Sequence, residues 1–101
     1  MLVISRAAER EAAEATAWYN ARRDGLAREF LDELHSELEA VESNPLRFAQ
    51  VQPRSETREF RQARLRRFPY LIVYEVKASN VLVVLAIAHA SRRPGYWQSR
   101  T

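Results

Sequence analysis

Residues 70–76 read YLIVYEV and residues 81–88 read VLVVLAIA. Apolar side chains occupy neighbouring positions in both runs, whereas a strand with one wet face would alternate apolar and polar residues. Such a pattern is typical of central strands that are covered on both faces. The connection between the runs, residues 77–80, is short enough to predict an antiparallel hairpin. Each face of this hairpin must therefore be covered: we expect helices to cover one face and to leave the other, apolar and rimmed with arginine, bare as a partner site.

The segments that precede the hairpin predict one short strand and two helices. Residues 1–5, MLVIS, have strand character, and residues 7–22 form an alanine-rich stretch of high helix propensity. A second helix is predicted over residues 26–41, where apolar residues recur with a period of 3.6. These apolar positions are Leu26, Phe30, Leu34, Leu38 and Val41. We expect the two helices to cover one face of the sheet, with Trp18 and Tyr19 as packing residues.

Residues 46–57 are polar and are expected to form a connection, after which the sequence period changes to two. Over residues 63–68 the alternation gives the predicted strand one basic face and one partly apolar face, and Pro69 marks a strand start or a bulge. The predicted fold is α+β, with an N-terminal strand, a helical hairpin and then a three-stranded, mostly antiparallel sheet. We expect a single domain that spans residues 1–101.

Charge is divided unevenly along the chain. Residues 1–46 carry 5 Lys and Arg against 10 Asp and Glu, and residues 47–101 carry 11 against 3. The second half should therefore attract an anionic partner. The chain has no cysteine, no glycine-rich phosphate loop and only 2 histidines, so we expect no disulfide, no metal and no cofactor. It also lacks a signal-peptide pattern and a membrane-length apolar run, so we expect a cytoplasmic protein.

Arginines are concentrated in the segment before the hairpin, at Arg54, Arg58, Arg61, Arg64, Arg66 and Arg67. Like charges at such close spacing repel one another unless acidic groups lie nearby. These acids are either internal, from Glu56, Glu59 and the acidic helices, or they belong to an external partner. The external alternative requires that the helices leave a basic and partly apolar sheet face bare.

A second group of cationic and aromatic residues follows the last predicted strand: His89, Arg92, Arg93, Tyr96 and Trp97. Cleavage of an RNA backbone needs a base, an acid and a cation that faces the developing negative charge. His89, Tyr96 and Arg92 offer these three groups, and Arg67 would lie nearby if the strands pair as predicted. Alternatively, His89 is a hydrogen-bonded structural residue. Trp97 either contacts a partner or packs against the edge of the domain.

Segments that resemble a known family run through nearly the whole chain: AEREAAEATAWYN (8–20), GLAREFLDEL (25–34), NPLRF (44–48), RQARLRRFPYLIVYEV (61–76) and VLAIAHASRRPGYWQSR (84–100). In their order and spacing the chain resembles the RelE/ParE superfamily of type II toxin-antitoxin toxins, which includes proteins labelled plasmid stabilization proteins. The resemblance implies a growth-inhibiting toxin that forms a hetero-oligomer with a cognate antitoxin. The acidic and apolar C-terminal segment of that antitoxin would wrap the sheet and helices of the toxin.

The superfamily divides by mechanism. RelE-like members cut mRNA on the ribosome, and ParE-like members inhibit DNA gyrase. RNA-cutting members carry an arginine three positions before the tyrosine of the central strand, where this chain has Leu71 before Tyr74. A leucine cannot stabilise a phosphorane, and FPY at residues 68–70 also looks like the ParE branch. The resemblance therefore favours a gyrase inhibitor, with an mRNA endonuclease as the alternative because Arg92 falls where the nucleases carry a late arginine.

The residues expected to contact the antitoxin or the target are Arg61, Arg64, Arg66, Arg67, Arg92, Arg93 and Trp97. If the chain is a nuclease, its candidate catalytic residues are His89, Arg92, Tyr96 and Arg67. The expected partners are an antitoxin and either DNA gyrase or the ribosome, with no membrane.

Overall fold

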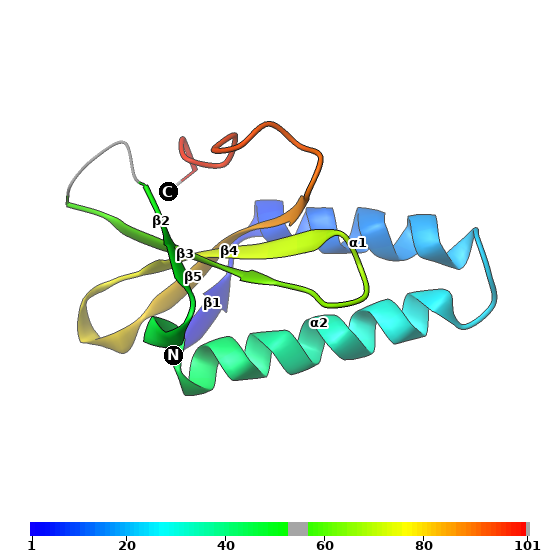
Figure 1. Ribbon diagram of the computed structural model, residues 1–101, viewed down its shortest axis with the longest axis horizontal. Coiled ribbons are helices and arrows are strands. Elements are labelled where there is room, and N and C mark those ends of the chain that lie inside the picture. The colour runs from blue at the N-terminus through cyan, green and yellow to red at the C-terminus, as the bar shows by residue number, and fades with distance from the viewer. Residues whose placement is uncertain (53–56, 101) are drawn as a thin grey trace.

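The predicted hairpin lies within a five-stranded sheet that two helices cover on one face (Figure 1). The computed structural model describes residues 1–52 and 57–100. The strands are β1 (Leu2–Ile4), β2 (Ala49–Val51), β3 (Glu59–Arg64), β4 (Tyr70–Val76) and β5 (Leu82–His89). The helices are α1 (Arg6–Asn20) and α2 (Leu26–Ser43), and the 3₁₀ turns are η1 (Pro45–Arg47) and η2 (Ala78–Asn80). The α+β class is thus confirmed.

The sheet has the order β1-β5-β4-β3-β2. β1 pairs with β5 in parallel, and the remaining neighbours are antiparallel, so the predicted β4–β5 hairpin is confirmed. The register places Leu71 opposite Ala88 and Val73 opposite Ala86. Residues that lie directly opposite one another share a face of the sheet. This register therefore decides which side chains can meet at a site.

Two details of the predicted sheet are wrong. β2 lies inside the expected connection and pairs with β3, which gives the sheet more strands than predicted. β2 has 3 residues, of which Ala49 and Gln50 are exposed, and so short a segment does not establish a period of two in the sequence. β3 ends at Arg64 rather than continuing through residues 65–68. The chain turns because the backbone N–H groups of Arg66 and Arg67 donate to the carboxylate of Glu33 on α2.

Local signals fix where the helices begin. The Ser5 side chain accepts a hydrogen bond from the Ala8 N–H at 3.1 Å and caps α1. Gly25 has a φ of 83°, a left-handed conformation that glycine adopts without steric cost, and α2 follows it directly. Tyr19 is buried as predicted, whereas Trp18 is 53% exposed, so the packing prediction for Trp18 is wrong. The guanidinium of Arg22 instead lies over the ring of Trp18.

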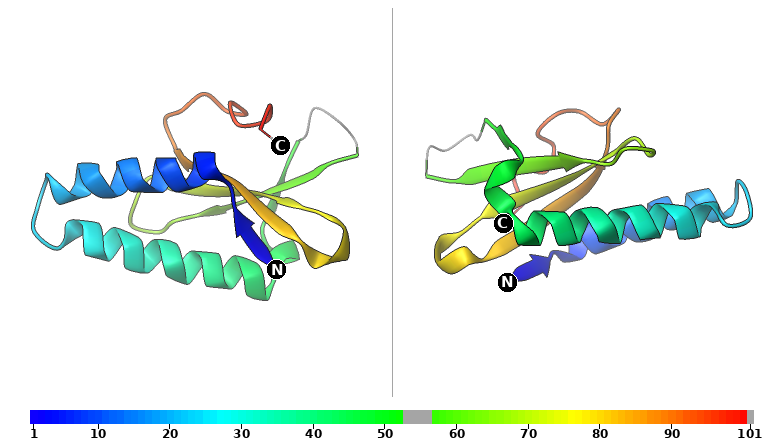
Figure 2. Two further views of the ribbon diagram at one scale, coloured as in Figure 1. Left: turned by 180° about the vertical axis from the view of Figure 1, so that it is seen from behind. Right: turned by 60° about the horizontal axis from the view of Figure 1, so that its bottom comes forward.

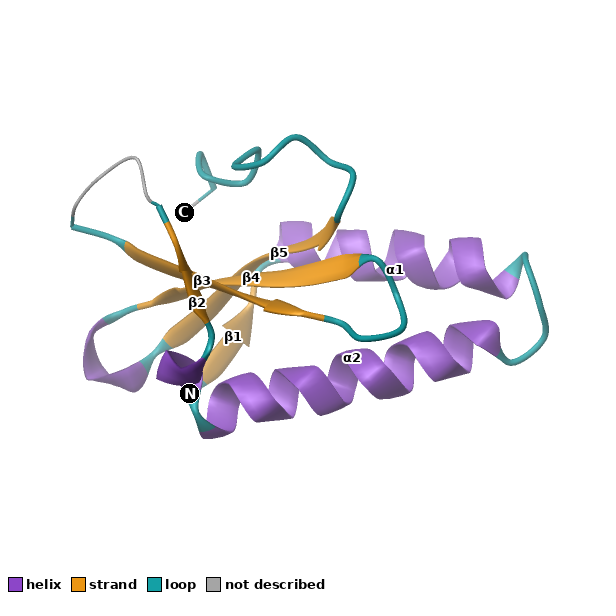
Figure 3. Cartoon of the chain, viewed as in Figure 1, coloured by secondary structure: helices purple, strands orange, loops and turns teal. Residues whose placement is uncertain are grey.

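The helices cover one face of the sheet, and a different segment covers much of the other. Residues 90–100, which we call the strap, cross the second face as a loop (Figure 3). Both views in Figure 2 place the strap on the side of the sheet opposite α2. Trp97 is only 4% exposed and packs with Phe60, Val73, Leu85, Ala86 and Ala88. The expectation of a bare second face is therefore wrong, because the C-terminal residues of the same chain occupy its centre.

Candidate partner-binding site

Arg58 forms a two-point ion pair inside the chain. Its Nε and Nη2 donate to the carboxylate of Glu75 at 2.9 and 2.7 Å. Glu75 is the one buried charged residue among those that the structure describes. The Arg58 hydrogen bond is the main cause that lowers the pKa of the Glu75 carboxyl, against the opposing effect of burial. Internal acids thus neutralise this arginine.

Arg61 is also paired within the chain. Its Nε donates to Glu59 at 2.6 Å, and its Nη1 donates to the backbone carbonyls of Leu46 and Phe48 beside η1. The Arg61 side chain is only 15% exposed. An arginine held by three acceptors in this way fixes the η1 segment to β3 and leaves little surface for another molecule.

Arg66 and Arg67 lie in the β3–β4 turn, where their backbones are held by α2. The Arg67 guanidinium also donates to Glu29 at 2.6 Å, while its side chain remains 61% exposed. The internal alternative for charge neutralisation therefore holds for three arginines of the cluster: Arg58, Arg61 and Arg67. Arg54 lies outside the described residues.

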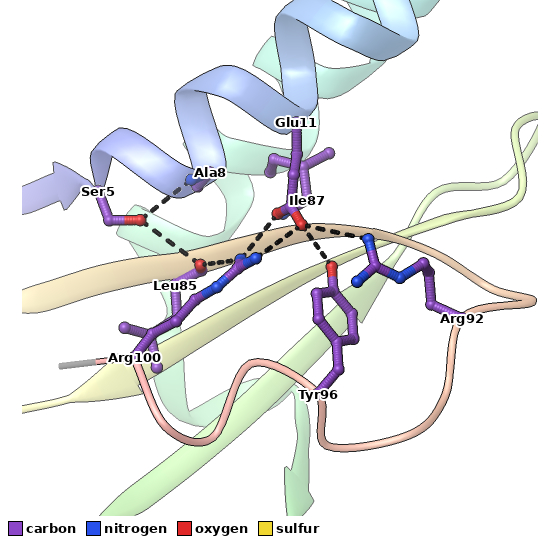
Figure 4. Close-up of polar contacts among 8 residues, drawn as sticks. All are labelled: Ser5, Ala8, Glu11, Leu85, Ile87, Arg92, Tyr96 and Arg100. Atoms are coloured by element: carbon purple, nitrogen blue, oxygen red, sulfur yellow. Dashed lines mark hydrogen bonds and ion pairs between the residues drawn. The ribbon is translucent and has the colours of Figure 1, made fainter.

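The strap is fastened to α1 by a single carboxylate (Figure 4). Glu11 accepts hydrogen bonds from the Ile87 N–H at 3.0 Å, from Tyr96 Oη at 2.6 Å and from both terminal nitrogens of Arg100 at 3.0 and 3.1 Å. The guanidinium of Arg92 lies 3.8 Å from the ring centre of Tyr96 and 3.9 Å from Glu11. Burial, together with the hydrogen bond to Glu11, raises the pKa of Tyr96 to about 12. Glu11 therefore holds both ends of residues 92–100.

Glu11 and Arg100 are site residues that the sequence reasoning missed. A signal for Glu11 was present, because it lies on the same face of α1 as the buried Ala8 and Ala15. A carboxylate on an apolar helix face requires a partner. Nothing in the sequence pattern marks Arg100 as that partner.

The imidazole of His89 is held by Ser91. Its Nδ1 accepts a hydrogen bond from the Ser91 backbone N–H at 3.1 Å and lies 2.8 Å from the Ser91 hydroxyl. A backbone N–H can only donate, so Nδ1 carries no proton and the neutral ring carries its hydrogen on Nε2. With its Nδ1 lone pair engaged by Ser91, His89 has an N–H donor rather than a basic lone pair at Nε2.

A cavity of about 410 Å³ between α1 and the ends of the central strands collects three of the four nuclease candidates. His89, Arg92 and Tyr96 line it together with the half-exposed Trp18. Arg67 is not among the described residues that line it. Arg67, the fourth candidate, lies in the β3–β4 turn and is paired with Glu29 of α2.

A second cavity, of about 210 Å³, lies on the other side of the strap and is called the strap pocket below. Leu71, Val73 and Ala88 of the sheet form its apolar floor, and residues 92–97 of the strap form a wall. Among the described residues that line it there is no Asp or Glu. Leu71, the residue that stands in place of the nuclease arginine, is therefore part of an apolar surface.

Two exposed arginines belong to the neighbourhood of the strap pocket. Arg93 lines it, and Arg64 lies opposite Leu71, which lies opposite Ala88, so the three residues share the strap face. Within residues 1–52 and 57–100, neither the Arg64 nor the Arg93 guanidinium has a hydrogen bond or ion pair. The arrangement can accept a group that combines negative charge with an apolar side chain.

The described residues include no helix that could cross a membrane. They likewise contain no cluster of His, Cys, Asp and Glu suited to a metal ion.

One protein family matches residues 2–94, and its description is "ParE toxin of type II toxin-antitoxin system, parDE". No curated protein and no solved structure shows significant similarity to the chain. The family match extends from β1 to the root of the strap and thus includes the whole sheet and both helices. The chain therefore belongs to the ParE toxin family, as a toxin of a type II toxin-antitoxin system whose partner is a cognate antitoxin.

Proposed function

We propose that this toxin acts by binding proteins rather than by cutting RNA, that its cellular target is DNA gyrase, and that its antitoxin binds the strap pocket. The observation that carries the proposal is the strap pocket itself, with an apolar floor at Leu71, Arg93 in its lining and Arg64 opposite Leu71 on the same face, both arginines without an ion pair to any other described residue. An acidic and apolar polypeptide segment matches this surface in charge and in hydrophobicity.

The groups that an RNA-cutting site needs are engaged in other contacts. A general base must present an available lone pair, but the Nδ1 lone pair of His89 accepts the hydrogen bond of the Ser91 N–H. The hydroxyl of Tyr96 donates to Glu11, and with a pKa of about 12 this phenol is a weak acid. Leu71 offers no charge to a phosphorane. These observations support protein binding over phosphodiester chemistry.

The antitoxin side of the proposal is tested with arginine variants. We expect expression of the chain alone to stop bacterial growth, and co-expression of the protein encoded by the adjacent gene to restore it. Arg64→Ala combined with Arg93→Ala should weaken the complex with that protein by at least about tenfold, since each charge-assisted hydrogen bond contributes roughly 1.5–3 kcal/mol. Arg28→Ala is the matched control, because Arg28 is an exposed arginine on α2. Harmless expression of the chain alone, or equal effects of the two sets of variants, would refute the proposal.

An mRNA endonuclease is the second candidate function. It is favoured by one observation, the convergence of His89, Arg92 and Tyr96 on one cavity. This alternative predicts cleavage of mRNA at discrete sites in a translating extract. His89→Ala or Arg92→Ala would abolish that cleavage while the circular dichroism spectrum stays unchanged.

A further inference from the structure

The strap pocket exists only while the strap is closed over the sheet. Its floor belongs to β4 and β5, but residues 92–97 supply the opposite wall, including Arg92 and Arg93. The strap is a loop, and side-chain hydrogen bonds to other described residues hold its far end. Tyr96 and Arg100 donate to Glu11, Arg100 also donates to the Leu85 carbonyl, Arg58 donates to the Arg100 carbonyl, and Gln98 donates to the Gln52 carbonyl. The position of the wall therefore depends on the fastening of a loop.

A direct line of contacts joins Glu11 to the arginines of the wall. Glu11 accepts the hydrogen bond of the Tyr96 hydroxyl at 2.6 Å, and the Tyr96 ring carries the Arg92 guanidinium at 3.8 Å from its centre. The Tyr96 N–H also donates to the backbone carbonyl of Arg93 at 3.3 Å, which closes the turn at Gly95. Gly95 has a φ of 79°, and a Cβ at this position would lie 3.2 Å from the Gln98 side chain. The conformation of the turn that presents Arg93 thus depends on the contact of Tyr96 with Glu11 and on the left-handed backbone of Gly95.

The strap residues that Glu11 fastens lie beyond the part of the chain that matches the family, whereas Glu11 itself lies inside it. The match ends at residue 94, before Tyr96, Trp97 and Arg100. The sheet floor and Arg92 and Arg93 lie inside it. Family membership therefore assigns no role to the contacts that Tyr96 and Arg100 make with Glu11.

We propose that Glu11 is a positioning residue for partner binding: it latches the strap through Tyr96 and Arg100, and this latch assembles the arginine wall of the strap pocket before the partner arrives. The proposal rests on the proposed function, because it names how that same pocket is built. Glu11 itself is only 12% exposed and contributes no surface to the strap pocket. A loose strap would leave the pocket formed for only a fraction of the time, and the apparent affinity falls by that fraction.

The first measurement follows the strap without any partner. In a Trp18→Phe background the fluorescence reports Trp97 alone, because the chain has 2 tryptophans. Glu11→Gln should shift the Trp97 emission to longer wavelength and increase its quenching by acrylamide. Glu14→Gln is the matched control, since Glu14 lies one turn further along α1 and has no hydrogen bond or ion pair among the described residues. A Trp97 signal that stays unchanged in Glu11→Gln overturns the latch.

The second measurement is the affinity for the protein encoded by the adjacent gene, determined by calorimetry with the full chain. We expect Glu11→Gln to weaken binding roughly tenfold, which corresponds to a strap that is closed about one tenth of the time. Arg100→Ala should act in the same direction, and it leaves the Glu11 bond to the Ile87 N–H intact. It therefore carries the test if Glu11→Gln fails to fold.

A double-mutant cycle separates positioning from a general loss of structure. If Glu11 acts through the wall, Glu11→Gln should cost little further affinity once Arg93→Ala is present, so the two effects are not additive. Additive effects, or a released strap with unchanged affinity, overturn the proposal and leave the proposed function standing. If Arg64→Ala and Arg93→Ala do not weaken binding, the proposed partner site fails as well, and this inference fails with it.

Discussion

Replacement of Tyr96 by phenylalanine should change the pH dependence of stability in a defined way. The Tyr96 hydroxyl donates to the Glu11 carboxylate at 2.6 Å, and a hydrogen bond to a charged group contributes about 1.5–3 kcal/mol. At pH 7 we expect Tyr96→Phe to lower the free energy of unfolding by an amount within this range. The substitution keeps the ring, so the stacking with Arg92 is retained.

The difference between the wild type and Tyr96→Phe should shrink at alkaline pH. The pKa of Tyr96 is about 12 in the folded chain, above its ordinary value of 10.0. A raised pKa means that the neutral phenol is favoured by folding, so its contribution is complete below pH 10 and is lost as the pH rises toward 12. The loss amounts to about 1.4 kcal/mol at pH 11 and approaches about 2.7 kcal/mol above pH 12.

Urea denaturation followed by far-UV circular dichroism measures this difference at pH 7, 9, 10 and 11. Comparison of the two proteins at each pH cancels the titration of Tyr19, Tyr70 and Tyr74, whose pKa values are also raised. The difference between the two unfolding free energies should shrink by about 1 kcal/mol between pH 10 and pH 11. A constant difference over this range would refute the assignment of a buried, carboxylate-bonded phenol at Tyr96.

Two further substitutions test the cover of the sheet and its buried ion pair. Trp97→Ala should lower the unfolding free energy by about 3 kcal/mol, the lower end for loss of a buried aromatic side chain because the strap can partly collapse, and urea denaturation measures it. An effect below about 1 kcal/mol would mean that the strap is not packed on the sheet. Glu75→Gln should cost about 3 kcal/mol at pH 7, since it leaves the Arg58 guanidinium without its carboxylate. Because the pKa of Glu75 is lowered by folding, the stability that its carboxylate contributes is present above its ordinary pKa and is lost as the pH falls. The difference in unfolding free energy between the wild type and Glu75→Gln should therefore become smaller at acid pH. A gap that persists under acid conditions would contradict the pairing.

Strong local patterns made much of this fold predictable. Consecutive apolar residues in β4 and β5 are typical of strands that are buried on both faces of a sheet. The spacing of Phe30, Leu34 and Val41 is typical of a helix with one buried face. β2 could not be predicted, because its 3 residues are too few to establish a period of two. The end of β3 depends on Glu33, which is far away in the sequence and captures the backbone of the turn.

The candidate site was predictable in its residue types but not in its contacts. The C-terminal arginines and rings do gather around two cavities, as the density of such residues between His89 and Trp97 indicates. Sequence alone does not tell which arginines are already neutralised, since Arg58 depends on Glu75 from a neighbouring strand and Arg67 depends on Glu29 from a helix. The sequence also does not show that the Trp97 side chain packs against the sheet. The partner of each side chain depends on distances in the tertiary structure, which local sequence periodicity does not encode.

The central claim, that this toxin binds proteins and does not cut RNA, is tested most directly with the purified chain in two parallel assays. One assay follows DNA supercoiling by gyrase, and the other follows the integrity of mRNA in a translating extract. We expect supercoiling to stop, cleaved DNA complexes to accumulate and the mRNA to remain intact. Discrete mRNA cleavage that disappears in His89→Ala, with gyrase unaffected, would contradict the account.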